Sequence, residues 1–170
     1  AVDARWPGRD FEVRVDPGTH EWSFVGRRWR HAGLPASALP GEIQYHNAAG
    51  ALAALEALDE ARPGLLADLD TSAVGRALRE VRLAGRFQVV PGAPQWILDV
   101  AHNEPAAQVL AANLRARPIA GRTIAVAGIL ADKDVAGIGR ALAACVDEWV
   151  LCGLDGPRGL DAAGLRQRLP

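Results

Sequence analysis

Polar side chains capable of acid–base chemistry or anion binding stand at the ends of short apolar runs. Asp99 and His102 lie at the end of the run Trp96 to Val100. A carboxylate and an imidazole so close together can hold a polar ligand and supply a group that exchanges protons near neutral pH. Neither helix capping nor packing requires this pair here, so we interpret both residues as functional. Their neighbour Asn103 is instead expected to cap the next helix.

Lys133 is the only lysine of the chain and lies in the stretch Ala131-Asp132-Lys133-Asp134, at the expected start of a helix. Capping and the helix dipole explain an aspartate at such a place. They do not explain a lysine, whose cation is unfavourable at a helix amino terminus. A bound anion could offset that cost, which makes Lys133 a candidate site residue. A solvated surface lysine is the alternative.

Two arginines and an asparagine are further candidates with ordinary alternatives. Arg158 lies in the turn sequence Asp155 to Gly159, where an arginine usually faces solvent. Arg86 lies at an expected domain boundary, where a guanidinium could bind a phosphate in a cleft, although a lone arginine there is usually a surface residue. Asn47 falls in the first turn of an expected long helix, where capping is the default interpretation. The sequence has no glycine-rich phosphate loop and no Gly-x-Ser-x-Gly, so no self-sufficient active site is expected.

A predicted α/β unit in the second half of the chain positions most of these residues. Short apolar runs alternate there with stretches of helical periodicity: Trp96 to Val100, Glu104 to Arg117, Thr123 to Gly128, Val135 to Val146, Glu148 to Leu151 and Asp161 to Leu169. This order predicts a Rossmann-like, mostly parallel sheet with flanking helices, its strands covered on both faces. Ligands gather at the carboxyl ends of such strands. The loops leaving those ends are Asp99 to Asn103, Leu130 to Asp134 and Gly153 to Gly159.

The first half of the chain predicts a β-hairpin followed by a helical hairpin. Its expected elements are strands at Phe11 to Val15, Glu21 to Val25 and Arg27 to His31, a helix from Gln44 to Ala61, and a second helix that opens at Asp70 and closes near Gly85. Asp16 to Thr19 is a good turn sequence between the first two strands. We place the domain boundary near Gly85.

Composition narrows the class of protein. The chain has 170 residues, of which 49% are apolar and 23% charged, and its net charge is -1. There is no excess of positive charge for a nucleic-acid backbone, so nucleic acid is not an expected partner. The longest apolar runs are about half the roughly 20 residues that span a membrane, and no signal peptide is visible. We therefore expect a cytoplasmic protein without membrane contact.

Five stretches of the chain, taken in order, carry a family resemblance. They are Asn47-Ala48-Ala49-Gly50-Ala51-Leu52-Ala53-Ala54-Leu55, Gly85-Arg86-Phe87-Gln88, Ile97-Leu98-Asp99-Val100-Ala101-His102-Asn103, Gly128-Ile129-Leu130-Ala131-Asp132-Lys133-Asp134 and Gly156-Pro157-Arg158-Gly159. Together they resemble the folate branch of the Mur ligase superfamily, the bifunctional dihydrofolate synthase/folylpolyglutamate synthases. One departure is Glu104, which stands before Pro105 where the family commonly has proline directly after the asparagine, and which adds a negative charge where an anion could bind.

The resemblance implies a domain organisation and a reaction. Residues 1–84 would be the carboxyl-terminal segment of a central ATPase domain, and residues 85–170 a Rossmann-like glutamate-ligase domain that is cut short. The phosphate loop, the Mg²⁺ ligands and most of the pterin site would lie outside this chain, in the missing amino-terminal ATPase domain. In the implied reaction ATP phosphorylates a dihydropteroate or folate carboxylate. The amine of L-glutamate then attacks the acyl phosphate, and phosphate leaves.

The resemblance also implies roles for individual residues. Asn47 would contact the adenine of ATP, Arg86 the phosphates, and Asp99 the nucleotide from across a cleft between the domains. His102 would act in catalysis by placing glutamate or the acyl phosphate. Loop topology adds two lesser candidates, which are Lys133 for catalysis and Arg158 for substrate binding.

Two other functions stay open at the level of sequence. One is a Mur ligase that acts on a cell-wall precursor, although the Asp-Val-Ala-His-Asn and Ala-Asp-Lys-Asp stretches favour folate. The other is a stand-alone nucleotide-binding or interaction module without catalysis. Because the phosphate loop is missing, we expect the isolated chain to lack ligase activity and to bind ATP with a dissociation constant of about 1 mM or weaker.

Overall fold

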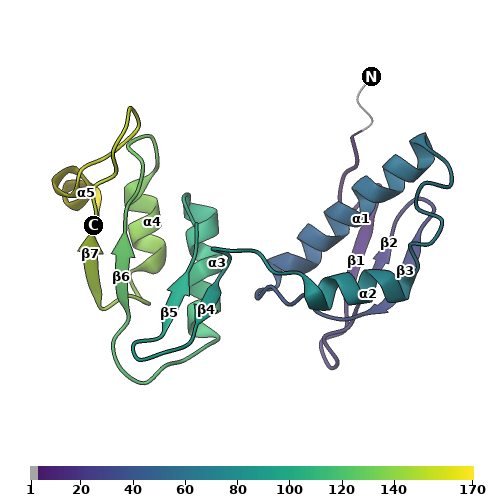
Figure 1. Cartoon of the computed structure of the whole chain (residues 1–170), viewed down its shortest axis with the longest axis horizontal. Coiled ribbons are helices and arrows are strands. Elements are labelled where there is room, and N and C mark those ends of the chain that lie inside the picture. Colours follow the sequence, from purple (N-terminus) through teal and green to yellow (C-terminus); the bar gives the residue numbers. More distant parts are fainter. Residues whose placement is uncertain (1–3) are drawn as a thin grey trace. The chain divides into compact units, whose positions relative to one another are not determined.

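A computed structural model of the chain describes residues 4–170 and divides into two compact units, one ending at Leu83 and one running from Ala84 to Pro170 (Figure 1). The elements in chain order are β1 (Glu12–Val15), β2 (Trp22–Val25), β3 (Arg30–Leu34), α1 (Ile43–Ala61), α2 (Thr71–Glu80), β4 (Gln88–Val90), β5 (Trp96–Leu98), α3 (Glu104–Arg115), β6 (Ile124–Ala127), α4 (Val135–Leu142), β7 (Glu148–Leu151) and α5 (Ala162–Arg168). Among residues 4–170, no helix combines the length and apolar character needed to cross a bilayer.

The first unit contains a three-stranded antiparallel sheet in the order β1-β2-β3. The predicted turn between β1 and β2 forms because the Asp16 carboxylate accepts hydrogen bonds from the backbone N–H groups of Gly18 and Thr19, at 2.7 and 3.1 Å. The third strand begins at Arg30 and not at Arg27. The amides that precede it donate instead to the buried carboxylate of Glu56, so they are not available to a strand ladder.

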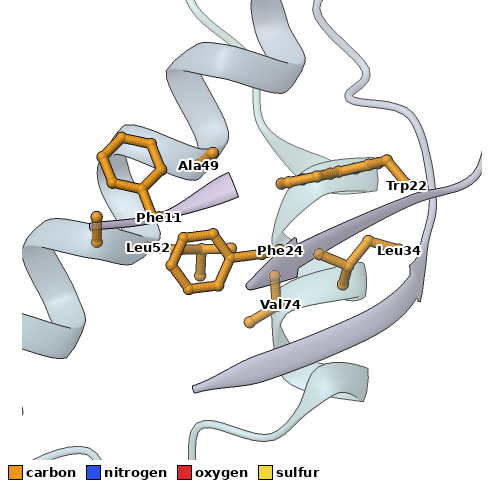
Figure 2. Packing of buried hydrophobic residues seen from close by; sticks show 8 residues of the cluster. Phe11, Trp22, Phe24, Leu34, Ala49, Leu52 and Val74 are labelled. Carbon is orange, nitrogen blue, oxygen red and sulfur yellow. The ribbon is translucent and has the colours of Figure 1, made fainter. Parts of the chain in front are cut away.

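Both helices of the first unit pack on this sheet, α1 against β1 and β2 and α2 against β3. Figure 2 shows the apolar side chains that meet between them: Phe11, Trp22, Phe24, Leu34, Ala49, Leu52 and Val74. As the sequence predicts, α2 is capped by Asp70, whose side chain accepts from the Ala73 N–H at 2.7 Å. The helix ends at Glu80, short of the predicted end near Gly85, because the backbone at Val81 is extended.

His31 is a buried titratable group of the first unit and makes the stability of that unit depend on pH. Its Nδ1 lies 2.9 Å from Thr71 Oγ1, and its Nε2 is buried without a hydrogen-bond partner. Burial lowers the pKa of His31 below the usual 6.5, against the opposing charges of Asp70 and Glu56. The neutral ring is therefore the folded form, and a proton on Nε2 would be a buried donor with no acceptor.

We expect the free energy of unfolding of the first unit to fall as the pH drops below about 6.5, by at most about 1.4 kcal/mol per pH unit, because the unfolded chain then takes up a proton that the folded unit does not. Above that pH this contribution is constant. Urea denaturation across the range should show a flatter profile in His31→Asn than in the wild type. His46→Asn, at an exposed position of α1, is the control and should keep the wild-type profile. Identical profiles in all three proteins would contradict the prediction.

The second unit is an α/β arrangement with two small sheets. β6 and β7 pair in parallel, as the order of the elements predicts, with Ile124 opposite Glu148 and Ala127 opposite Leu151. The structure differs for β5, which pairs antiparallel with β4 and has no strand neighbour in the parallel sheet. Strand β4 was not predicted, because its three residues give no measurable periodicity.

One face of the parallel pair packs on the helices, and the other is open. Trp149 and Leu151 contact the core of the second unit, whose buried members are Ala107, Ala111, Ile129, Val135, Ile138, Leu142, Leu160 and Leu165. The alternate residues Ile124, Val126 and Val150 are exposed. The expectation that these strands are covered on both faces is thus wrong for the residues described.

Candidate anion-binding pocket

A pocket of about 270 Å³ lies at the carboxyl end of β6. Its lining residues are Ala101, His102, Gly128, Ile129, Leu130, Lys133 and Arg158. Three of the predicted site residues, His102, Lys133 and Arg158, come from three different loops and are brought together here. For Lys133 and Arg158 this is the expected outcome, because the loops that leave the carboxyl ends of the paired parallel strands β6 and β7 converge. His102 follows β5, which lies outside that pair.

Hydrogen bonds to backbone groups fix the two loops that carry Lys133 and Arg158. The Ala131 N–H donates to the Arg158 carbonyl oxygen at 3.0 Å, which ties the loop after β6 to the loop after β7. Arg168 of α5 donates from Nη1 to the Ala131 carbonyl oxygen at 2.7 Å. Asp134 caps α4 by accepting from the Gly137 N–H, so Lys133 stands immediately before the cap. The predicted role of an aspartate as a cap is thus confirmed for Asp134.

Asp132 links the two cations of the pocket. Its Oδ2 accepts a hydrogen bond from Arg158 Nη2 at 2.7 Å and lies 3.7 Å from Lys133 Nζ. The hydrogen bond from Arg158, followed by the charges of Arg158 and Lys133, holds the pKa of the Asp132 carboxyl below its usual range. The Lys133 side chain is 26% exposed and that of Arg158 60%, so the ammonium is the more deeply set cation.

His102 presents one ring nitrogen for chemistry. Its Nδ1 lies 3.0 Å from the Val100 carbonyl oxygen, which can only accept, so we assign the ring hydrogen to Nδ1. In the neutral ring Nε2 then carries the lone pair. That nitrogen can accept a hydrogen bond or a proton from a bound ligand.

Asp99 and Arg86 lie in the same unit but do not line the pocket. Both carboxylate oxygens of Asp99 accept backbone hydrogen bonds at 2.8 Å, one from the Phe87 N–H and one from the Ala101 N–H. Phe87 is a buried residue with a φ of 45°, and Gly85 before it has a φ of 69°. The exposed Arg86 is held on this tight turn. Asp99 therefore positions the turn that carries Arg86.

Asn47 belongs to the first unit, and its predicted capping role is wrong. Helix α1 begins at Ile43, four residues before Asn47, and the residue at its N-cap, Glu42, makes no side-chain cap hydrogen bond. Asn47 is exposed and donates from Nδ2 to Gln44 Oε1 at 3.1 Å. Its side chain lies on the surface of the helix, where it is free to meet a ligand. By contrast Asn103 caps α3 as predicted, accepting from the Ala106 N–H.

The sequence favours Asp132 only as a candidate cap and gives no indication of its contact with Arg158. The two residues are 26 positions apart, and no local pattern connects them. The sequence feature that could have pointed to this contact is the pair of acidic residues on either side of Lys133. Within residues 4–170, no group of three or more His, Cys, Asp or Glu side chains is arranged to hold a metal ion.

The fold and the pocket define a class of protein: an α/β domain with a small cationic site where its strands end. Residues 85–170 match the Mur ligase glutamate ligase domain, and the chain belongs to the Mur ligase family. The dihydrofolate synthase/folylpolyglutamate synthase of Escherichia coli is 39% identical over 161 residues, which are 95% of this chain and 36% of the relative. The enzyme of the same name from Mycobacterium tuberculosis is 38% identical over 127 residues, or 75% of this chain and 26% of the relative.

Solved structures of enzymes with these names are also similar to this chain. E. coli FolC in complex with ADP superposes with a TM-score of 0.76 at 38% identity, and the match covers 96% of this chain and 36% of that one. A bifunctional folylpolyglutamate synthase/dihydrofolate synthase with Mn, AMPPNP and L-glutamate bound gives a TM-score of 0.75 at 36% identity, with the same coverage. The chain thus spans about a third of the length of the relatives it matches.

Proposed function

We propose that this chain is part of an ATP-dependent ligase that adds L-glutamate to dihydropteroate and to folates already carrying glutamate, through an acyl phosphate. The observation that carries the proposal is the convergence of His102, Lys133 and Arg158 on one small pocket of a domain of the glutamate ligase family. Relatives of this chain have been solved with L-glutamate and AMPPNP, and with DHPP and ADP. These ligands are the expected classes of substrate here.

The pocket suits the amino acid substrate. Its volume of about 270 Å³ is at the lower end of ligand pockets, so it fits a small molecule and not a whole folate. Lys133 and Arg158 supply cations for a carboxylate. His102 Nε2 can accept a proton or hydrogen bond from the attacking ammonium group of glutamate, which must lose a proton before it can act as a nucleophile.

Residues outside the pocket would bind ATP. Arg86 would meet the phosphates, because its guanidinium is exposed on a turn whose backbone is fixed. Asp99 would act mainly by holding that turn, since both of its oxygens already accept backbone amides. Asn47, exposed on α1, stays the candidate for the adenine. Bound ATP would supply the phosphoryl group that activates the substrate carboxylate.

The metal ligands, the phosphate loop and most of the pterin site would belong to an amino-terminal ATPase domain, of which residues 1–84 would form the last segment. The 170-residue chain alone should then show no ligase activity.

The test is an assay of the polypeptide encoded by the complete gene with ATP, L-glutamate and dihydropteroate, beside the 170-residue chain alone. The proposal expects glutamate-dependent release of phosphate from the complete polypeptide and none from the chain. Turnover of a UDP-linked muramyl substrate in place of dihydropteroate would identify a cell-wall ligase instead. Micromolar ATP binding by the 170-residue chain, measured by calorimetry, would favour a stand-alone nucleotide-binding module.

Arg86→Ala and Asp99→Ala should each raise the KM for ATP of the complete enzyme about tenfold or more, because loss of one charge-assisted contact costs about 1.5–3 kcal/mol. If Asp99 acts through the Arg86 turn, the double variant should be little worse than either single one. Steady-state kinetics measure all three, with the melting temperature as a check on folding. Fully additive effects would mean that Asp99 touches the nucleotide by itself, and unchanged kinetics would remove both residues from the site.

A further inference from the structure

Asp132 lies outside the pocket lining but controls the charge within it. Its carboxylate is 2.7 Å from the Arg158 guanidinium and 3.7 Å from the Lys133 ammonium. With His102 neutral, Lys133, Arg158 and Asp132 carry a single net positive charge between them. Arg168 and Asp134 are also close by, but they have opposite signs and are engaged by the Ala131 carbonyl and the Gly137 amide respectively. The Glu104 carboxylate lies beside that of Asp134.

A ligand anion that approaches Lys133 and Arg158 must also approach Asp132, because the same carboxylate contacts both cations. Attraction to the cations and repulsion from the fixed negative charge both grow in proportion to the charge of the ligand. Asp132 therefore weakens the binding of a doubly charged anion by twice as much free energy as it weakens the binding of a singly charged carboxylate.

We infer that Asp132 is a specificity-determining residue that lowers the preference of the His102–Lys133–Arg158 pocket for a doubly charged phosphate-like anion over a single carboxylate group. The inference rests on the proposed function and names the chemistry of that site's ligand. In a reaction that consumes ATP and releases phosphate, this weakens competition by the phosphate product for the amino acid subsite.

The backbone shows why the carboxylate can have this role without building the pocket. Arg158 is held to the neighbouring loop through its own carbonyl oxygen, which accepts from the Ala131 N–H, independently of the Asp132 side chain. Asp132 is about half exposed, and its removal uncovers no buried group. The Asp132→Asn variant should therefore keep the pocket in place and change its charge alone.

The experiment titrates the ¹⁵N-labelled 170-residue chain with acetate and, separately, with sulfate at constant low ionic strength, and follows the amide signals of Leu130, Lys133 and Arg158. Asp132→Asn should bind acetate about fivefold more tightly than the wild type and sulfate about 25-fold more tightly, since one charge at about 4 Å in water changes binding about fivefold per ligand charge. The melting temperature should not fall.

Glu148→Gln is the matched control. It also removes a carboxylate from an exposed ion pair, with Arg122 at 3.1 Å, but at the opposite end of the parallel pair. It should change both affinities much less than Asp132→Asn does, because the Coulomb energy falls with the distance between the charge and the ligand.

Equal gains for the two anions, or no gain for either, would overturn the role of Asp132 while leaving the pocket as an anion site. If neither acetate nor sulfate shifts these amides, in the wild type or in Asp132→Asn, the proposed function is overturned as well. The two failures are thus distinguishable.

Discussion

Gly159→Ala should abolish measurable L-glutamate binding by the 170-residue chain and lower the free energy of unfolding of the second unit by about 1–3 kcal/mol. A Cβ atom at this position would lie 2.0 Å from the Leu154 carbonyl oxygen and 2.9 Å from the Leu154 carbonyl carbon. These are backbone atoms, so no side-chain rotation can relieve the overlap. The loop must open, and it carries Arg158 directly before Gly159.

Gly153→Ala, in the same loop, is the control. There a Cβ would meet its nearest neighbours, in Asp161 and Ala162, at 3.6 Å, which is ordinary van der Waals contact. Binding should be measured by titration with L-glutamate, and stability by urea denaturation. If Gly159→Ala binds glutamate as well as Gly153→Ala does, the position of Arg158 is not needed for the site.

Glu56→Ala should destabilise the first unit by about 3 kcal/mol or more, the largest effect expected from any single carboxylate of the chain. Glu56 is 1% exposed and accepts from the N–H groups of Arg27, Arg28 and Trp29, at 3.1, 2.6 and 2.6 Å. Hydrogen bonds to a charged group contribute about 1.5–3 kcal/mol each, and the amides would lose their common acceptor. The strand β3 begins directly after them.

Glu12→Ala, at an exposed position of β1, is the control. Glu12 pairs with Arg14, and both side chains are at least half exposed, so its loss should cost about 1 kcal/mol or less. Urea denaturation followed through the Phe24 amide reports on the first unit, while the Val126 amide serves as an internal reference for the second. A cost for Glu56→Ala no larger than that of Glu12→Ala would show that Glu56 does not hold the turn before β3.

Local chemistry explains which parts of the fold were predictable from the sequence. The caps at Asp70 and Asn103 and the turn at Asp16 depend on residues within three positions of one another, so the sequence carries them directly. Part of the pocket was also predictable, because the parallel pairing of β6 and β7 brings the loops that follow them together. Lys133 and Arg158 meet for that reason, whereas His102 follows β5, which lies outside the parallel pair.

Contacts over long sequence separations account for what the sequence could not predict. The start of β3 depends on Glu56, which lies more than 25 residues away on α1. The antiparallel partner of β5 is a three-residue strand with no pattern of its own. The Asp132–Arg158 pair joins two loops that become neighbours only through the parallel pairing of β6 and β7. In each case the partner is set by packing and not by spacing.

An NMR titration of the ¹⁵N-labelled chain with L-glutamate measures directly whether the pocket at the end of β6 binds this amino acid. We expect saturable shifts of the His102, Leu130, Lys133 and Arg158 amides, with a dissociation constant of about 1 mM. In Arg158→Ala the affinity should fall at least about tenfold. Saturable shifts confined to the first unit would contradict glutamate binding at this pocket. So would the absence of saturable shifts at the pocket when the glutamate concentration is far above the expected dissociation constant.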